Sequence, residues 1–165
     1  MSNFCAGVDV GATTVKIGTF SDKGELIEKW EIPTRKEEQG AHILQDIVDS
    51  LEAKREKCQG NILGIGMGIP GPVTDDGVVH RCTNFGWGVF SVKEKVIEMT
   101  GVGRVRISND ANIAALGEMW KGGGRGHDSI VMVTLGTGVG GGIIQKGRVL
   151  MGSSGAGGEI GHIKV

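Results

Sequence analysis

The sequence predicts an α/β fold in which one complete lobe, with elements in the order β-β-β-α-β-α-β-α, precedes the first strands of a second, similar lobe. Three observations lead to this prediction: the hydrophobic periods of successive segments, a weak internal repeat, and the crowding of glycine toward the end of the chain. Glycine provides 31 of the 165 residues, with 16 between positions 117 and 161 but only six in the first 60. Glycine at this density indicates backbone that closely approaches another group.

The composition excludes several classes of protein. A hydrophobic fraction of 39% and a net charge of −1 argue against disorder and against a nucleic-acid-binding surface over the whole chain. Because no run of 18 apolar residues and no secretory signal pattern is present, we expect neither a membrane span nor export. Cys5, Cys58 and Cys82 are odd in number and far apart, which is typical of reduced thiols in a cytoplasmic protein.

The first part of the chain predicts three short strands and a helix. Apolar and β-branched segments separated by turn residues predict an antiparallel meander with strands at 4–10, 14–20 and 26–32. Pro33 ends the meander. The next apolar residues recur on one face of a 3.6-residue period, which predicts a helix: Ile43, Leu44, Ile47, Val48 and Leu51.

The rest of the first lobe alternates strands with helices. In order, we expect a strand at 61–69, a helix at 92–100, a strand at 104–108 and a helix at 110–120. The first of these strands is broken by Pro70-Gly71-Pro72, and a loop with the sequence TNFGWG follows. Asn109 or Asp110 is the expected N-cap of the last helix.

The residues after this helix repeat the beginning of the chain. Strands expected at 129–135, 140–145 and 148–151 follow a glycine-rich stretch, KGGGRG, that is typical of a hinge. This is the layout of the duplicated actin-like ATPase (ribonuclease H-like) fold. It divides the chain into an N-terminal lobe at 1–120, a hinge at 121–127 and the beginning of a C-terminal lobe at 128–165, so we expect the chain to be a fragment.

Two glycine-containing motifs are candidates for phosphate binding. DVGATTVK (9–16) brings a carboxylate to a tight turn, where hydroxyls and amides can contact a phosphate and Asp9 can hold Mg²⁺. LGTGVGGG (135–142) matches the dinucleotide fingerprint in form, but a strand instead of a helix follows, which favours a hairpin phosphate loop. The alternatives are an ordinary hairpin for the first motif and a bend where two lobes pack for the second.

Two further motifs place polar side chains at suitable positions. SNDAN (108–112) puts Asn109 and Asp110 where a strand meets a helix, a common site position in α/β folds, although simple helix capping would also explain it. GEIGH (158–162) holds Glu159 and His162 three residues apart. That pair could bind a sugar hydroxyl, a metal ion, or neither.

Taken together, these motifs resemble the ROK family of bacterial repressors and sugar kinases, and its glucokinase branch in particular. DVGATTVK and LGTGVGGG look like the family's two phosphate loops, and NDAN, ALGEMWKGGG and GAGGEIGH follow in the family's order and spacing. KWEIPTR and TNFGWG are similar to the glucokinase branch. The resemblance implies phosphorylation of glucose to glucose 6-phosphate with ATP and Mg²⁺. It also implies a cytoplasmic protein, homodimeric when full length, with no nucleic-acid or membrane partner.

The resemblance also implies a role for each matched position. Asp110 would be the general base that takes the proton of the sugar 6-hydroxyl. The residues that would hold the sugar are Gly71, Asn84, Asn109, Asp110, Glu159 and His162. Those that would surround the ATP phosphates are Asp9, which would also hold Mg²⁺, and Gly11, Thr13, Thr14, Lys16, Thr137 and Gly138.

The chain departs from the family pattern at two places. Ala12 stands where the family usually has glycine. The family's zinc site adds a cysteine cluster after EIGH, so His162 would be the one zinc ligand here, and we expect structural zinc only in a full-length chain. We accordingly expect the chain alone to be weakly active or inactive.

Other functions remain open at this point. One alternative is a kinase for N-acetylmannosamine, N-acetylglucosamine or fructose, and another is a non-catalytic, sugar-binding or regulatory member of the family. A sugar-responsive repressor would need a DNA-binding segment before the first strand, for which we expect no room ahead of Phe4.

Overall fold

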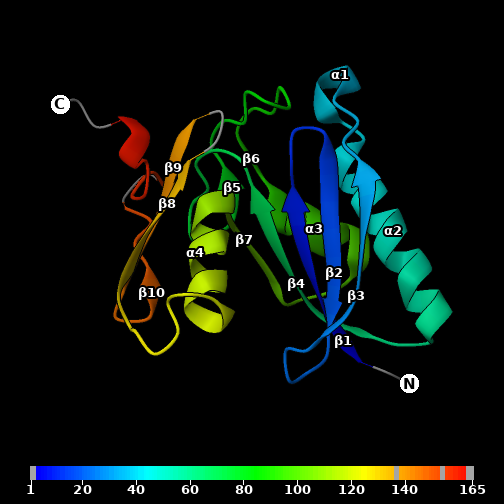
Figure 1. The fold of residues 1–165 in the computed structure, drawn as a ribbon. Helices are drawn as coiled ribbons and strands as arrows, with labels where there is room; N and C mark the ends of the chain where they lie inside the picture. The colour runs from blue at the N-terminus through cyan, green and yellow to red at the C-terminus, as the bar shows by residue number, and fades with distance from the viewer. Residues whose placement is uncertain (1–2, 136–137, 153–154, 163–165) are drawn as a thin grey trace.

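The first two-thirds of the chain contains a five-stranded mixed sheet in the order β3-β2-β1-β4-β7 (Figure 1). The computed structural model describes residues 3–135, 138–152 and 155–162. The strands of this sheet are β1 (Phe4–Val10), β2 (Thr14–Phe20), β3 (Leu26–Pro33), β4 (Ile62–Ile69) and β7 (Val105–Asn109). The first three pair antiparallel as the predicted meander, while β4 and β7 continue the sheet in parallel with β1.

Helices cover both faces of this sheet, and strand β4 shows why. Successive side chains of a strand point to opposite faces, so Ile65, Met67 and Ile69 of β4 share one face and Gly64, Gly66 and Gly68 the other. The first face packs against α2 (Ile43–Cys58) and α3 (Val92–Thr100). The glycine face receives α4 (Asp110–Lys121), where a Cβ added to Gly68 would lie 3.6 Å from the Ile113 side chain.

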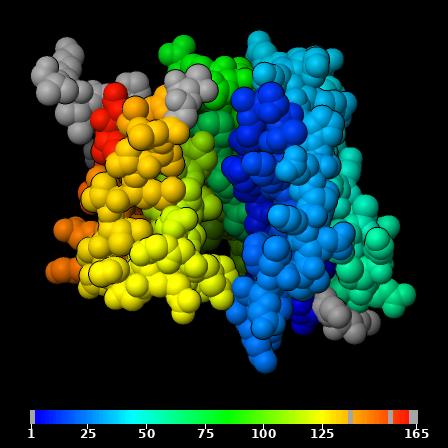
Figure 2. Space-filling model, in the orientation of Figure 1, coloured from blue at the N-terminus to red at the C-terminus, as the bar shows by residue number. Residues whose placement is uncertain are grey.

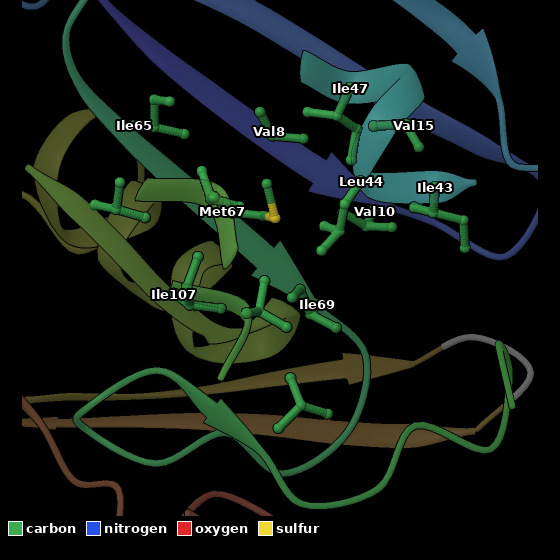
Figure 3. Close-up of a cluster of buried hydrophobic side chains, with 14 of the residues drawn as sticks. Val8, Val10, Val15, Ile43, Leu44, Ile47, Ile65, Met67, Ile69 and Ile107 are labelled. Atoms are coloured by element: carbon green, nitrogen blue, oxygen red, sulfur yellow. The ribbon is translucent and has the colours of Figure 1, made fainter. Parts of the chain in front are cut away.

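The hydrophobic core lies between the sheet and the helices α2 and α3. Figure 3 shows side chains of β1, β2, β4, β7 and α2 pointing toward one another. The labelled ones are Val8, Val10, Val15, Ile43, Leu44, Ile47, Ile65, Met67, Ile69 and Ile107. The α2 residues are those whose 3.6-residue period predicted the helix.

A second, antiparallel sheet follows α4, in the order β10-β9-β8. Its strands are β8 (Ile130–Leu135), β9 (Val139–Gln145) and β10 (Arg148–Val149). It matches the meander that the internal repeat predicts, and with the first sheet it gives the actin-like ATPase arrangement. Helix α4 stands between the two sheets and contacts both of them (Figure 1).

The glycines of β9 allow α4 to lie directly on the strand. A Cβ added to Gly142 would lie 2.6 Å from both the Ala111 carbonyl oxygen and the Ala115 Cβ. On the other side of the strand, a Cβ on Gly141 would lie 2.7 Å from the Gly158 carbonyl oxygen. The backbone that these glycines approach so closely is therefore largely the protein's own.

The segment predicted as a hinge is an ordered turn at the end of α4. The Gly122 and Gly124 N–H groups both donate to the Glu118 carbonyl oxygen at 3.0 Å. The Gly123 N–H donates to the Glu118 carboxylate at 2.8 Å. A hinge function for residues 121–127 stays a prediction.

Four short elements were not expected from the sequence: α1 (Glu37–Gly40), β5 (Val78–Val79), β6 (Phe90–Ser91) and the 3-10 helix η1 (Ile160–His162). Strands β5 and β6 pair with each other beside the main sheet. No helix in the described part of the chain is long and apolar enough to cross a bilayer.

A pair of glycine substitutions tests the packing of α4 on β9. Gly142→Ala forces β9 away from the helix and should lower the free energy of unfolding by about 1–3 kcal/mol, as overpacking does. Gly117 lies in α4, and nothing lies within 4 Å of a Cβ added there. Gly117→Ala should therefore raise the free energy of unfolding by about 0.5–1 kcal/mol. Chemical denaturation of both variants measures the two values, and equal effects would contradict this account.

Candidate functional site

The carboxyl ends of β1, β4 and β7 meet at one edge of the first sheet, where open α/β sheets usually bind ligands. A cavity of about 820 Å³ opens there. Figure 2 shows a hollow between the blue strands of the first sheet and the yellow-to-orange surface of the second. Seven of the residues singled out in the sequence line the cavity: Asp9, Gly71, Asn84, Asn109, Asp110, Gly138 and Glu159.

Asn109 joins three segments at the floor of the cavity. Its Oδ1 accepts hydrogen bonds from the N–H groups of Ala111 at 2.9 Å and Asn112 at 3.3 Å, so Asn109 is the N-cap of α4. Its Nδ2 donates to the Gly71 carbonyl oxygen at 3.1 Å. Asn109 is 6% exposed and both ends of its amide are bonded to the protein, so it fixes the start of the helix and the adjacent loop together.

Asp110 follows as the first residue of α4, and it lines the cavity. Burial raises the pKa of Asp110, and the negative charge of Asp9 across the cavity raises it further. Hydrogen bonds from the Ala111 N–H, at 2.8 Å, and from the Asn109 side chain oppose this shift. Asp110 is thus a carboxylate with increased affinity for a proton, positioned by a helix N-terminus.

Gly71 brings two loops of the cavity wall into contact. Its φ is +100°, in the left-handed region that favours glycine, and an added Cβ would lie 2.8 Å from the Arg81 carbonyl oxygen. The loop after β4 can therefore lie against the segment that leads to Asn84. Asn84 itself is exposed on the cavity side of that segment.

The first predicted phosphate motif forms the turn between β1 and β2. The Gly11 N–H donates to the Thr14 carbonyl oxygen at 3.0 Å, which closes the turn. The Thr34 hydroxyl supports it by donating to the Gly11 carbonyl oxygen at 2.8 Å. Asp9 and Lys16 lie opposite each other in the strand register, but only Asp9 lines the cavity. Gly11, Thr13, Thr14 and Lys16 thus lie beside the cavity without lining it.

The glycines of the second predicted phosphate motif line the cavity and also pack against α4. Gly138, Gly140 and Gly141 line the cavity opposite the first sheet. Gly140 and Gly142 also lie in β9 on the side that packs against α4. This agrees with the alternative interpretation of the motif, a glycine-rich bend at a packing contact. Thr137 lies outside the described residues.

The GEIGH segment docks on the outer side of β9. A Cβ on Gly158 would lie 2.3 Å from the Gly141 carbonyl oxygen and 3.4 Å from the Asn112 Oδ1, so the segment reaches both β9 and α4. This contact brings Glu159 to the cavity. His162 ends η1, and its side chain lies outside the described part of the structure.

The structure adds cavity residues that the sequence interpretation missed, notably Arg81 and Thr134. Arg81 precedes Asn84 in the same loop, a closeness in sequence that could have identified it. Thr134 lies on β8 and reaches the cavity through the approach of the second sheet, for which the sequence carries no local signal. Asn112, in the first turn of α4, is buried with its Oδ1 unpartnered beside the GEIGH segment.

The oxygen donors at the cavity suit a hard cation that also binds a ligand, and they suit less well a metal ion bound by protein side chains alone. Asp9 and Asp110 both line the cavity, and Mg²⁺ commonly binds one or two carboxylates together with water and phosphate oxygens. Among the residues that the structure describes, no group of three or more His, Cys, Asp or Glu side chains could hold a metal ion. The four ligands of a structural zinc site are therefore not present in that part of the chain.

Proteins named as sugar kinases are similar to this chain in sequence and in structure. The chain is 48% identical to the glucokinase of Halalkalibacterium halodurans, over 96% of this chain and 49% of that protein. It is 33% identical to the N-acetyl-D-glucosamine kinase of Vibrio atlanticus, over 96% of this chain and 52% of that one. A ROK family glucokinase from Streptomyces griseus, solved in complex with glucose and AMPPNP, superposes with a TM-score of 0.84 at 33% identity, covering 98% of this chain and 51% of that one.

These matches cover nearly all of this chain, but the chain spans only about half the length of the curated relatives it matches. The family model, in contrast, matches nearly every residue, and it is the model of the ROK family over residues 5–165. The chain belongs to the ROK family.

Proposed function

We propose that the protein carrying this chain is an ATP-dependent glucokinase, which transfers the γ-phosphoryl group of ATP to the 6-hydroxyl of glucose. The observation that carries the proposal is the position of Asp110, a carboxylate of raised pKa at the start of α4, in a cavity between the two sheets. The similarity to glucokinases over nearly the whole chain supports it.

Asp110 would act as the general base. The sugar oxygen forms a bond to the γ-phosphorus while the bond to the bridging oxygen of ADP breaks, and the hydroxyl proton passes to Asp110. A raised pKa strengthens a carboxylate as a base, provided that it remains ionised at the working pH. Asn84, Glu159 and His162 would bind sugar hydroxyls, since amide and carboxylate groups suit the donors and acceptors of a sugar.

The ATP phosphates would lie between the β1–β2 turn and the Gly138 region. Asp9 is the residue that would hold Mg²⁺, which neutralises phosphate charge during transfer. Gly11, Thr13, Thr14 and Lys16 would contact the phosphates from one side, and Thr137 and Gly138 from the other. Closure of the two lobes about 121–127 would exclude water and limit wasteful hydrolysis of ATP.

The proposal extends to the setting of the whole protein. We infer a cytoplasmic location, which the three free cysteines support, because reduced thiols persist in that compartment. We also infer a homodimer, and a structural zinc ion to which His162 would contribute one ligand. Each of these inferences rests on the family resemblance.

A kinase for another hexose is the second candidate, favoured by the similarity to an N-acetyl-D-glucosamine kinase. The same Asp110 chemistry would serve both sugars, so their discrimination would depend on the residues around the sugar 2-position. A coupled ATP assay over glucose, N-acetylglucosamine, N-acetylmannosamine and fructose separates the two candidates. A purely sugar-binding protein would show binding with no turnover of any of them.

Removal of the proposed base should abolish catalysis and leave the fold intact. Asp110→Asn keeps a side-chain oxygen for the Ala111 N–H but removes the proton acceptor, so we expect kcat for glucose to fall about 10²–10⁴-fold. The melting temperature should stay near that of the wild type. Asp22→Asn, in the exposed β2–β3 turn, is the matched control and should change neither value. A wild-type rate in Asp110→Asn would refute the role of the base.

The pH profile should report the charge of Asp9. The base works when ionised, so activity is lost as the pH falls through the pKa of Asp110. Because the Asp9 charge raises that pKa, Asp9→Asn should move the acid limb of kcat/KM for glucose to lower pH, whatever its effect on the maximal rate. Asp9→Glu keeps the charge and should leave the limb in place. A limb that moves to higher pH in Asp9→Asn would show that the carboxylates do not interact in this way.

A further inference from the structure

The loop that presents Asn84 is closed at its base by two backbone hydrogen bonds. The Cys82 N–H donates to the Trp87 carbonyl oxygen and the Trp87 N–H to the Cys82 carbonyl oxygen, both at 3.1 Å. Between them, the Phe85 N–H donates to the Cys82 carbonyl oxygen at 3.2 Å. The Asn84 side chain makes no hydrogen bond to another residue in the described part of the chain. Its place in the cavity wall is therefore set by the loop backbone.

Trp87 anchors the base of this loop to a distant part of the chain. Trp87 is 7% exposed, and its indole Nε1–H donates to the Gly40 carbonyl oxygen at 3.2 Å. Its ring lies edge-on to Phe85 at 5.1 Å and to Phe90 at 5.3 Å between centroids. Gly40, just before α2, has a φ of +68°, and a Cβ there would lie 2.8 Å from the indole Nε1. Glycine at this position is what allows the hydrogen bond to form.

The packing around Trp87 is incomplete on its outer side. A second cavity, of about 350 Å³, lies there and is lined by Trp87 together with Leu44, Phe90 and Met99. Gly40 lines this space as well. The directional hydrogen bond to its carbonyl oxygen therefore orients the indole on the side where the aromatic contacts leave room.

We propose that Trp87 is a positioning residue for the sugar, which acts by holding the Cys82–Trp87 loop so that Asn84 faces the cavity. The inference rests on the proposed function, because Asn84 binds sugar only if the cavity is a sugar site. Trp87 itself lines the outer cavity and not the catalytic one. Loss of the indole N–H should therefore weaken sugar binding and leave the phosphate side of the site unchanged.

Trp30 provides a matched control. Its Nε1–H donates to the Ser50 Oγ at 2.8 Å and so ties β3 to α2, in the same way that Trp87 ties its loop to Gly40. Trp30 lines neither cavity. Trp→Phe at either position keeps an aromatic ring and removes one indole hydrogen bond, so the two variants should lose similar stability.

The experiment measures kcat and both KM values in the complete protein that carries this chain. In Trp87→Phe we expect the KM for glucose to rise about fivefold to tenfold, the effect of one hydrogen bond, while kcat and the KM for ATP stay within twofold of the wild type. Gly40→Ala should act in the same direction, and Trp30→Phe should leave all three constants unchanged. Equal KM values for glucose in Trp87→Phe and Trp30→Phe would overturn the proposal.

A double-mutant cycle tests whether Trp87 acts through Asn84. In an Asn84→Ala background, Trp87→Phe should no longer change the KM for glucose, whereas independent effects would multiply and contradict the proposal. If the wild type phosphorylates no sugar, the proposed function fails by itself. Calorimetric titration of the same variants with glucose then tests the inference separately. The inference is supported if Trp87→Phe binds glucose more weakly and Trp30→Phe does not. It is refuted if the two variants bind glucose equally well or if no glucose binds.

Discussion

The close contact between α4 and β9 is the constraint on which the rest of the structure depends. Helix α4 packs on the glycine face of β4 on one side and on β9 on the other, and both contacts are possible because small residues let backbones meet. A larger residue at Gly142 would separate the two sheets and widen the cavity between them. The distance across the site is thus set by residues that take no part in any reaction.

Asp110 links the same contact to the proposed chemistry. The residue begins α4, so the helix that separates the sheets also carries the carboxylate into the space between them. Two effects then raise its pKa: burial, and the negative charge of Asp9, which lies on β1 of the first sheet. The packing that buries Asp110 therefore increases the affinity of the proposed base for a proton.

The sequence was most informative where local residues decide the structure. The bounds predicted for β1, β2 and α3 agree with the structure because turn residues mark their ends, such as Gly101 with a φ of +70° after α3. The paired two-residue strands β5 and β6 are too short for any period, and Thr134 reaches the cavity only through the docking of the second sheet. The glycines of β9 were ambiguous, since a phosphate and a helix require the same absence of a side chain.

The neighbouring residues Asn109 and Asp110 are constrained by different requirements. Asn109 must accept hydrogen bonds from the helix and donate one to the Gly71 carbonyl oxygen, and among short side chains only asparagine offers both groups at that reach. Asp110 could be replaced by a residue of similar shape without loss of structure. In a population selected for folded protein alone, position 109 would stay fixed while position 110 drifted, whereas selection for the proposed kinase activity would fix both.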